Sequence, residues 1–370
     1  MTPTTRRRIK LLLSLLAICA LLTLGLTEIM LRVQQWLGPI VDLDLKPDDK
    51  AIGANLAYSD VLNHVAEPGG DWDADGIYTA DAPNAPNCAP RLLFMGDSFI
   101  QGLLGKDDKV PHQVRAFFFQ QLHRDVCVFN AGHVSYAPSL YIIQAKQLIP
   151  RLHPDIILLD IDETDLYDDY YRYRDLSVRD PDGSLVAVRA TPTFYQYHQA
   201  MLATNDQFFY TARLIDQLYV KNIWYPRTVK EYNVGREHDL FFASRIPEGE
   251  ARQKYAPQIA YFQSTLDELT RTVLSQLGGR TAGVIYLHHP HLEHLKSDGP
   301  VFNDIVSESI AEAANRYHVR YYDATDDLRK IAGEKPQDYY VPGDMHFSTL
   351  GYRVYGELVA KYLDAALASQ

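Results

Sequence analysis

The segment RLLFMGDSFIQG, residues 91–102, begins with an apolar run and turns at a glycine. Similar runs follow later in the chain: VCVFN at 126–130, DIILLDI at 155–161, AGVIYL at 282–287 and VRYYD at 319–323. Short runs bounded by Gly, Pro and Asp, with helix-length segments between them, are typical of parallel strands buried on both faces. The pattern predicts a doubly wound α/β domain, with helical layers on both faces of a five-stranded parallel sheet.

Two of the intervening segments have a clear helical pattern. Between residues 259 and 277 the apolar side chains recur every three or four positions, which forms one stripe along a helix. The final segment, about 349–367, repeats this pattern, and Ser348 or Thr349 can cap its first turn. Both segments are therefore expected to cover the sheet.

Residues 166–255 interrupt the alternation of strands and helices. Within them Pro181-Asp182-Gly183 is a turn signal, and the residues around it predict a β-hairpin over 178–188. A long insertion after the third strand is expected to stand beside the strand ends as a lid or a substrate wall.

The N-terminus has the composition of a membrane anchor. Four basic residues lie within residues 1–10, and the uncharged run LLLSLLAICALLTLGL occupies 11–26. Continued to Leu31, the segment spans roughly 30 Å at about 1.5 Å per residue. We expect a retained transmembrane helix at 11–32, with its N-terminus in the cytoplasm and the body periplasmic or extracellular. A cleaved signal peptide is the alternative, but no small-x-small site closes the run.

Composition and charge narrow the classes of protein. The 370 residues are 46% hydrophobic and 22% charged, which is typical of a globular protein. The formal net charge is −11, and without the four basic residues of 1–10 the remaining chain, 11–370, carries −15. The negative charge of residues 11–370 repels a phosphate backbone, which argues against a nucleic-acid partner. Residues 33–90 are expected to form a tether and an irregular cover ahead of a domain at 91–370.

Ligands of an open parallel sheet bind at the carboxyl ends of its strands, so the residues after each run are candidates for a site. Gly96-Asp97-Ser98 follows the first run; a serine there either only caps the next helix or faces the cleft. Asn130-Ala131-Gly132 ends the second run, where a glycine lets a backbone N–H approach a bound oxygen. Thr164 and Asp165 follow the third run.

Asp344 and His346 lie just before the final helix. An Asp two residues before a His can accept a hydrogen bond from one ring nitrogen, which leaves the other nitrogen to take a proton. Together with a serine hydroxyl, these two side chains would make a nucleophilic triad.

These segments resemble the conserved blocks of the SGNH hydrolases, also called GDSL-type esterases. The matching segments are FMGDSFIQG at 94–102, FNAG at 129–132, HPDIILLDIDETD at 153–165 and DMHFSTLGY at 344–352. The resemblance implies a flavodoxin-like three-layer fold, and the anchor ahead of the domain is similar to a membrane-anchored bacterial branch of the family.

The resemblance also implies roles for single residues. Ser98 is the expected nucleophile, and Asp344 and His346 complete the triad. The backbone N–H groups of Ser98 and Gly132 are expected to form the oxyanion hole with Thr164, which stands where the family has an asparagine. A hydroxyl reaches less far than an amide, and loss of one such donor costs on the order of 100- to 1000-fold in turnover. Substrate-lining residues are expected at Asp97, Asn130 and Asp165.

The segment YLHHPHLEHL, residues 286–295, holds four histidines. Its proline breaks any helix, so no i, i+4 pair of histidines with a catalytic Glu arises in a helical frame. We therefore predict no metal and no cofactor, and we expect His288 and His289 to line the cleft.

Of the three cysteines, Cys88 precedes the first expected strand and Cys127 begins the second. Export permits a disulfide between them, and the alternative is two buried free thiols. Cys19 lies in the apolar segment.

The sequence thus predicts an exported, membrane-anchored serine hydrolase. Its substrate would be an acylated glycan of the cell envelope, or another ester, with acetyl as the favoured acyl group. Water as the acceptor gives an esterase, and a sugar hydroxyl gives an O-acyltransferase. The alternative is a catalytically weakened homologue that binds glycan or scaffolds an envelope assembly. The sequence does not define the oligomeric state.

Overall fold

The computed structural model describes residues 3–37, 56–66, 68–69, 71–74, 76–78, 88–102, 105–190, 208–224, 246–296 and 302–368. The residues divide into two compact units. One unit comprises Met1–Asp49 and Pro192–Tyr232, and the other comprises Lys50–Thr191 and Asn233–Gln370. The α/β domain belongs to the second unit, and the insertion expected at 166–255 is divided between the two.

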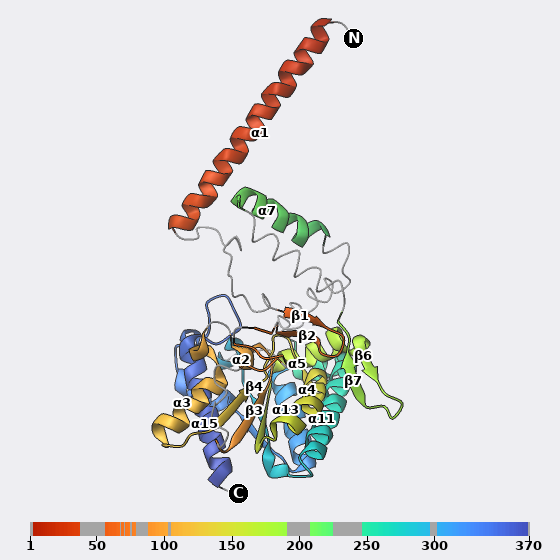
Figure 1. Ribbon diagram of the computed structural model, residues 1–370, viewed down its shortest axis with the longest axis vertical. Helices are drawn as coiled ribbons and strands as arrows, with labels where there is room; N and C mark the ends of the chain where they lie inside the picture. The colour runs from red at the N-terminus through yellow and green to blue at the C-terminus, as the bar shows by residue number, and fades with distance from the viewer. Residues whose placement is uncertain are drawn as a thin grey trace. The chain divides into compact units, whose positions relative to one another are not determined.

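A five-stranded sheet forms the centre of the α/β domain (Figure 1). Its strands are β3 (Arg91–Met95), β4 (Cys127–Asn130), β5 (Ile156–Ile161), β8 (Val284–His288) and β9 (Arg320–Asp323). The order is β4-β3-β5-β8-β9, and every neighbouring pair is parallel. All five apolar runs are confirmed as strands. In this order the topological switch point lies between β3 and β5, where doubly wound folds bind ligands.

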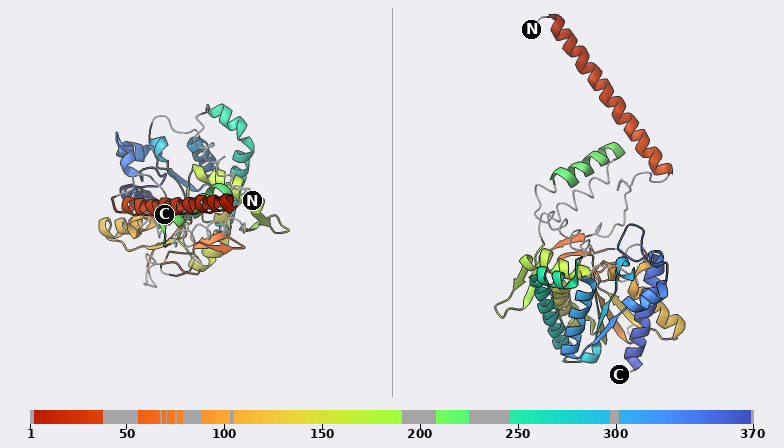
Figure 2. Two further views of the ribbon diagram at one scale, coloured as in Figure 1. Left: turned by 90° about the horizontal axis from the view of Figure 1, so that it is seen from above. Right: turned by 180° about the vertical axis from the view of Figure 1, so that it is seen from behind.

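Helices cover both faces of the sheet (Figure 2). One face packs against α4 (Pro138–Leu152), α11 (Ala256–Gln276) and α13 (Phe302–Tyr317). The other packs against α3 (Val110–Gln121), α14 (Thr325–Ala332) and α15 (Thr349–Ala368). Because side chains alternate along a strand, Leu92 and Phe94 enter the α3/α15 core while Leu93 and Met95 enter the α4/α11 core. The three-layer prediction is confirmed.

The two helices predicted from their apolar spacing are present. In α11 the stripe is buried against the sheet, as Phe262, Leu266 and Leu269 show no exposure. At the start of α15, Ser348 Oγ accepts a hydrogen bond from the N–H of Gly351, so Ser348 is the N-cap.

Short helices occupy the connections. They are α2 (Ser98–Gln101), η1 (Lys106–Asp108), α5 (Glu163–Tyr167), η2 (Asp168–Tyr173), η3 (Arg174–Leu176), η4 (Val220–Trp224), α10 (Glu248–Lys254), η5 (Thr281–Gly283), α12 (Leu292–Leu295) and η6 (Pro336–Tyr339).

Two small antiparallel pairs flank the main sheet. The predicted hairpin is confirmed as β6 (Ser177–Arg179) and β7 (Leu185–Val188). Its turn places Gly183 at φ 81°, in the left-handed region that glycine enters readily. The N-terminal cover, expected to be irregular, contains a second pair, β1 (Leu56–Ser59) and β2 (Asn63–Ala66).

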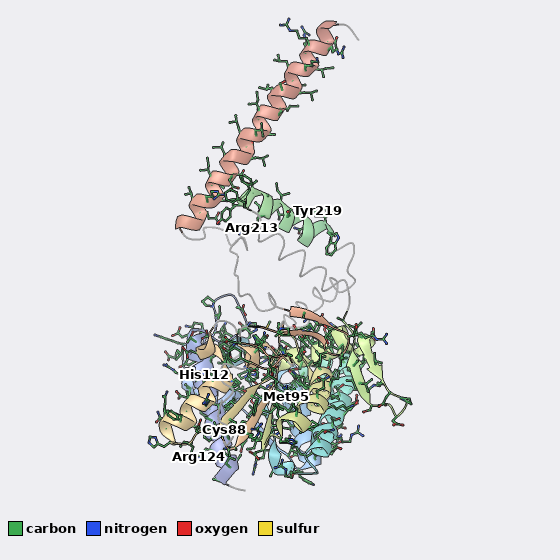
Figure 3. All side chains as sticks on the ribbon, in the orientation of Figure 1. Cys88, Met95, His112, Arg124, Arg213 and Tyr219 are labelled. Carbon is green, nitrogen blue, oxygen red and sulfur yellow. A yellow bond between two sulfur atoms is a disulfide. The ribbon has the colours of Figure 1, made fainter. Side chains whose placement is uncertain are left out.

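The N-terminal unit is built on α1 (Pro3–Leu37). Its apolar side chains project freely (Figure 3); Leu11 is 72% exposed and Leu21 is 69% exposed. Over Thr5–Gln34 this helix is long and apolar enough to cross a membrane, a property that signal sequences share.

A second helix of this unit, α7 (Tyr210–Tyr219), begins against α1. The Glu28 carboxylate accepts hydrogen bonds from the N–H of Tyr210 at 3.2 Å and from the N–H of Thr211 at 2.8 Å. The Arg32 guanidinium bonds Glu28 at 2.7 Å and lies 5.2 Å from the centre of the Tyr210 ring. Glu28 therefore caps the first turn of α7.

Cys88 and Cys127 form a disulfide with a Cα–Cα distance of 5.4 Å. Cys88, which is labelled in Figure 3, lies just before β3, and Cys127 is the first residue of β4. Of the two alternatives for these cysteines, the structure contains the disulfide.

Candidate active site

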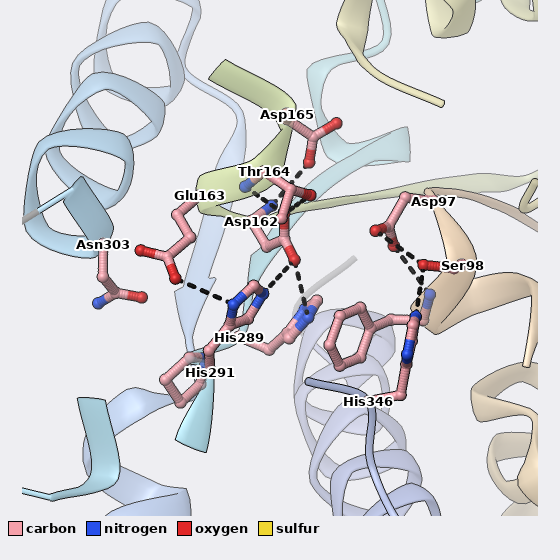
Figure 4. A network of polar contacts seen from close by, with 12 residues as sticks. Asp97, Ser98, Asp162, Glu163, Thr164, Asp165, His289, His291, Asn303 and His346 are labelled. Atoms are coloured by element: carbon pink, nitrogen blue, oxygen red, sulfur yellow. Dashed lines mark hydrogen bonds and ion pairs between the residues drawn. The ribbon is translucent and has the colours of Figure 1, made fainter. Parts of the chain in front are cut away.

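A serine, a histidine and an aspartate form a hydrogen-bonded row at the carboxyl end of β3. His346 Nε2 lies 2.8 Å from Ser98 Oγ, and His346 Nδ1 lies 2.5 Å from Asp344 Oδ1. Ser98 is 248 residues away from His346 in the chain, yet the two side chains face each other (Figure 4). The fold thus brings together the three residues that the sequence suggested as a triad.

The local backbone holds Ser98 in place. Asp97 is the N-cap of α2, and its Oδ1 accepts the N–H of Phe99 at 2.9 Å. A Cβ on Gly96 would lie 2.4 Å from Ile100 Cγ1, so only glycine allows the sharp turn from β3 into α2. Ser98 therefore opens a helix, with its side chain at the end of the sheet.

A second close approach occurs at Gly132. A Cβ there would lie 2.5 Å from Gln101 N and 2.7 Å from Ile100 C, which are backbone atoms that cannot easily give way. Glycine at this position lets the loop after β4 pass directly beside α2, so the two loops of the expected oxyanion site are in contact.

The charges in the row suit proton transfer from serine to histidine. A hydrogen bond from His346 lowers the pKa of Asp344, which keeps this half-exposed carboxyl ionised. An ionised Asp344 accepts a hydrogen bond from Nδ1–H, so Nε2 of a neutral His346 is left to accept from Ser98.

Ser98 Oγ also lies 3.3 Å from Asp97 Oδ2. Burial, with Asp162 adding to it, raises the pKa of Asp97 well above its usual value.

Two of the three expected oxyanion donors, the N–H of Gly132 and the hydroxyl of Thr164, already have partners. The N–H of Gly132 donates to Asn130 Oδ1 at 2.9 Å, and Asn130 Nδ2 donates to the carbonyl of Ile100 at 2.9 Å. The Thr164 hydroxyl donates to Asp162 Oδ1 at 2.5 Å. A substrate oxygen would have to compete with Asn130 for one donor and with Asp162 for the other.

Asp165, which was expected to line the substrate, is 1% exposed and stabilises the start of α5. One carboxylate oxygen accepts the N–H of Asp162 at 2.8 Å, and the other accepts the hydroxyl of Tyr141 at 3.0 Å. Burial raises the pKa of Asp165 well above its usual value, and Asp162 raises it further.

The histidines after β8 are buried against the loop after β5. His288 is fully buried, with Nδ1 2.8 Å from the carbonyl of Ile161 and Nε2 2.9 Å from Asn303 Oδ1. His289 is 1% exposed, and its Nδ1 lies 3.1 Å from Asp160 Oδ1. Both histidines, which were expected to line the cleft, are thus bonded inside the protein.

His291 connects two carboxylates of the loop after β5. Its Nε2 lies 2.6 Å from Asp162 Oδ2 and its Nδ1 lies 2.9 Å from Glu163 Oε1. Burial by itself would lower the pKa of His291, but Asp162 and Glu163 raise it well above the usual value. Burial likewise opposes ionisation of Asp162, yet His291 holds the pKa of Asp162 below its usual range.

Sequence reasoning missed this cluster because its members are 129 residues apart in the chain. The signal that could have found them is the adjacency of β5 and β8 in the sheet, since both loops leave the same edge. The Phe99 ring packs between the cluster and the row, with its centre 4.2 Å from that of His289 and 5.0 Å from that of His346.

No protein-family model matches the chain, and the search of curated proteins finds no match. Among solved structures, the chain is similar to a lipase/acylhydrolase from Enterococcus faecalis, with 12% identity, 74% of this chain and 96% of that chain covered, and a TM-score of 0.39. It is also similar to the acetylxylan esterase Axe2 from Geobacillus stearothermophilus, with 12% identity, coverage of 74% and 94%, and a TM-score of 0.43.

A further similar structure is a two-domain esterase, CEX, active on acetylated mannans. It is 13% identical, with 75% of this chain and 48% of that chain covered and a TM-score of 0.39. Similarities of this size do not define a function, so function has to be argued from the site.

Proposed function

We propose that the protein is a serine esterase or O-acyltransferase of the SGNH type, with Ser98 as the nucleophile. One observation carries the proposal: the continuous row from Asp344 through His346 to Ser98, with contacts of 2.5 and 2.8 Å. A nucleophile bonded to a base, which is in turn oriented by a third group, is the arrangement that activates a hydroxyl for acyl transfer.

In the proposed reaction, His346 Nε2 takes the hydroxyl proton of Ser98 as Oγ attacks the ester carbonyl. A bond forms between Oγ and the carbonyl carbon, and the carbonyl oxygen becomes an oxyanion. When the intermediate collapses, the bond to the leaving alcohol breaks and His346 returns the proton to that alcohol. Water, or a sugar hydroxyl, then attacks the acyl-serine by the same path in reverse.

The oxyanion is proposed to bind at the N–H groups of Ser98 and Gly132. For Gly132 to donate, its hydrogen bond to Asn130 has to weaken as substrate enters. The Thr164 hydroxyl has a single proton, and it donates this proton to Asp162. While it does so, Thr164 cannot act as a third donor to the oxyanion. Because one lost donor costs on the order of 100- to 1000-fold, we expect turnover to be slow.

The proposed substrate is an acylated glycan of the cell envelope, with acetyl as the favoured acyl group. Support comes from the aromatic side chains of η2, where the half-buried Tyr170 and Tyr171 have ring centres 5.1 Å apart. Partly exposed aromatic rings suit contact with the apolar face of a sugar. The apolar α1, proposed as a retained anchor with the body outside the cytoplasm, supports the envelope assignment.

Labelling of the serine tests the proposal. The full chain in detergent is treated with a fluorophosphonate probe, and labelled peptides are identified by mass spectrometry. We expect label on Ser98, lost in Ser98→Ala and His346→Ala and kept in Ser275→Ala, which alters an exposed serine on α11. Unlabelled samples of the wild-type protein and of each variant are then assayed with p-nitrophenyl acetate and acetylated sugars. Absence of label on folded wild-type protein would contradict the enzyme proposal.

A second candidate function is glycan binding without turnover. It is favoured by the internal hydrogen bonds of the N–H of Gly132 and of the Thr164 hydroxyl, which leave fewer free donors for an oxyanion. Retained glycan binding together with absent label would support this second candidate.

A further inference from the structure

Three buried side chains, Asp162, His289 and His291, bring potential metal-ligand atoms within 4.8 Å of one another. Asp162 follows β5, and the two histidines follow β8, the neighbouring strand. The group therefore arises where two strand ends meet, and not from spacing along one helix. This placement is why the sequence, read for helical pairs of histidines, predicted no metal.

Both imidazoles are oriented in the same way. His289 Nδ1 faces Asp160 at 3.1 Å, and His291 Nδ1 faces Glu163 at 2.9 Å. Their Nε2 atoms both face Asp162 Oδ2, at 3.6 Å from His289 and 2.6 Å from His291 (Figure 4). Metal-binding histidines commonly donate one ring N–H to a carboxylate and present the other nitrogen to the ion.

Charge in the cluster also points to a cation. Asp160, Asp162 and Glu163 are each at most 3% exposed. Buried carboxylates require a compensating charge or full hydrogen bonding. Within the described chain, Asp160 Oδ2, Glu163 Oε2 and His289 Nε2 are buried without a hydrogen-bond partner.

We propose that Asp162 Oδ2, His289 Nε2 and His291 Nε2 bind one divalent transition-metal ion of the zinc class. Two imidazoles and one carboxylate suit Zn²⁺ and its first-row neighbours better than Ca²⁺ or Mg²⁺. Tetrahedral ligands about 2.0–2.2 Å from Zn²⁺ stand roughly 3.3–3.6 Å apart. The contact between His289 and Asp162 already has this length, and the contact between His291 and Asp162 has to open by under about 1 Å.

The ion would join the loop after β5 to the loop after β8, behind the Phe99 ring. The proposed role is structural, because Phe99 separates the cluster from His346. Fixing Asp162 also fixes Thr164, whose hydroxyl and N–H both bond the Asp162 carboxylate.

Metal analysis tests this inference. The full chain is purified in detergent without metal-affinity chromatography, incubated with micromolar Zn²⁺, dialysed and analysed by inductively coupled plasma mass spectrometry. We expect about one Zn²⁺ per chain, with background levels in His291→Ala and Asp162→Asn. His318→Ala, which removes an exposed histidine elsewhere, should keep the ion.

A second measurement needs no variant. After Co²⁺ replaces Zn²⁺ in the wild-type chain, a nitrogen- and oxygen-ligated tetrahedral site should give visible absorption bands that excess Zn²⁺ removes. Less than about one tenth of an equivalent of Zn²⁺ on wild-type protein with a native near-ultraviolet circular dichroism spectrum would overturn the inference. The cluster would then be a hydrogen-bonded network of carboxylates and protonated imidazole.

Fluorophosphonate labelling of the same samples tests the esterase proposal separately from the metal site. Fluorophosphonate labelling of Ser98 without bound metal overturns only the metal site. Bound metal without labelling overturns only the proposed reaction.

Discussion

At the scale of single residues, Asp344 controls which nitrogen of His346 carries the proton. Its Oδ1 lies 2.5 Å from Nδ1 and also accepts the backbone N–H of His346 at 3.0 Å. Asparagine at this position can turn its NH₂ toward Nδ1, and this would leave the proton on Nε2, where His346 cannot accept from Ser98. In the proposed reaction, this one atom pair therefore decides whether Ser98 can be activated.

We therefore predict that Asp344→Asn lowers kcat/KM for p-nitrophenyl acetate by between about 100- and 10,000-fold. The circular dichroism spectrum should be unchanged, because Asp344 is half-exposed. Asp326→Asn, at a side chain that is 79% exposed, is the matched control and should keep full activity. Equal activity of the two variants would show that Asp344 has no part in the reaction.

A second residue-scale prediction concerns Asp169, a fully buried carboxyl in η2. Oδ1 accepts the N–H of Ser139 at 2.9 Å, whereas Oδ2 has no hydrogen-bond partner in the described part of the chain. Burial raises the pKa of Asp169 to about 7, against the hydrogen bonds from Ser139 that lower it. Between about pH 4 and pH 7 the folded chain thus holds a proton that the unfolded chain has released. Stability due to this group therefore falls as pH rises through that window.

Asparagine at 169 stays neutral and keeps an oxygen for Ser139. We expect Asp169→Asn to raise the free energy of unfolding by roughly 2–4 kcal/mol at pH 8, and by less at pH 5. Urea unfolding followed by circular dichroism at both pH values measures this difference. Asp182→Asn, in the exposed hairpin turn, is the control. A gain that is the same at both pH values would contradict the assigned cause.

At the scale of secondary structure elements, the sequence predicted what apolar spacing alone specifies. The five strands, α11, α15 and the hairpin all have patterns that depend only on local periodicity and turn residues. The capping of α7 by Glu28 could not be predicted, because the carboxylate is 182 residues from Tyr210. The hydrogen bonds from the N–H of Gly132 to Asn130 and from the Thr164 hydroxyl to Asp162 could not be predicted either. They depend on how side chains in neighbouring loops are oriented, and a resemblance between short sequence segments does not specify this.

The contact between Glu28 and α7 gives an element-scale prediction. Without the cap, the first N–H groups of α7 lose their acceptor, which costs about 1 kcal/mol. Glu28→Ala should therefore speed amide hydrogen exchange at residues 210–213 by roughly fivefold, measured by mass spectrometry on the full chain in detergent. Glu334→Ala, at an exposed acid elsewhere, should not change it. Unchanged exchange in Glu28→Ala would mean that the cap does not hold α7.

At the scale of the whole molecule, two independent features support the proposed export. An apolar helix near the N-terminus suits membrane insertion, and the disulfide between Cys88 and Cys127 suits an oxidising environment. Neither depends on the catalytic assignment. The proposed export of the domain therefore does not depend on whether Ser98 is active.

The last prediction concerns the contribution of the disulfide to stability. It closes a loop between residues 39 apart, and restricting such a loop in the unfolded chain contributes about 4 kcal/mol in the chain-entropy estimate. Urea unfolding of wild-type protein should thus shift to lower urea in reductant, whereas Cys88→Ala/Cys127→Ala should be weakened already and insensitive to reductant. Cys19→Ala, at the exposed free cysteine, should behave as wild type. If protein isolated from the envelope fraction carried both thiols free on non-reducing peptide mapping, the disulfide and its argument for export would both be lost.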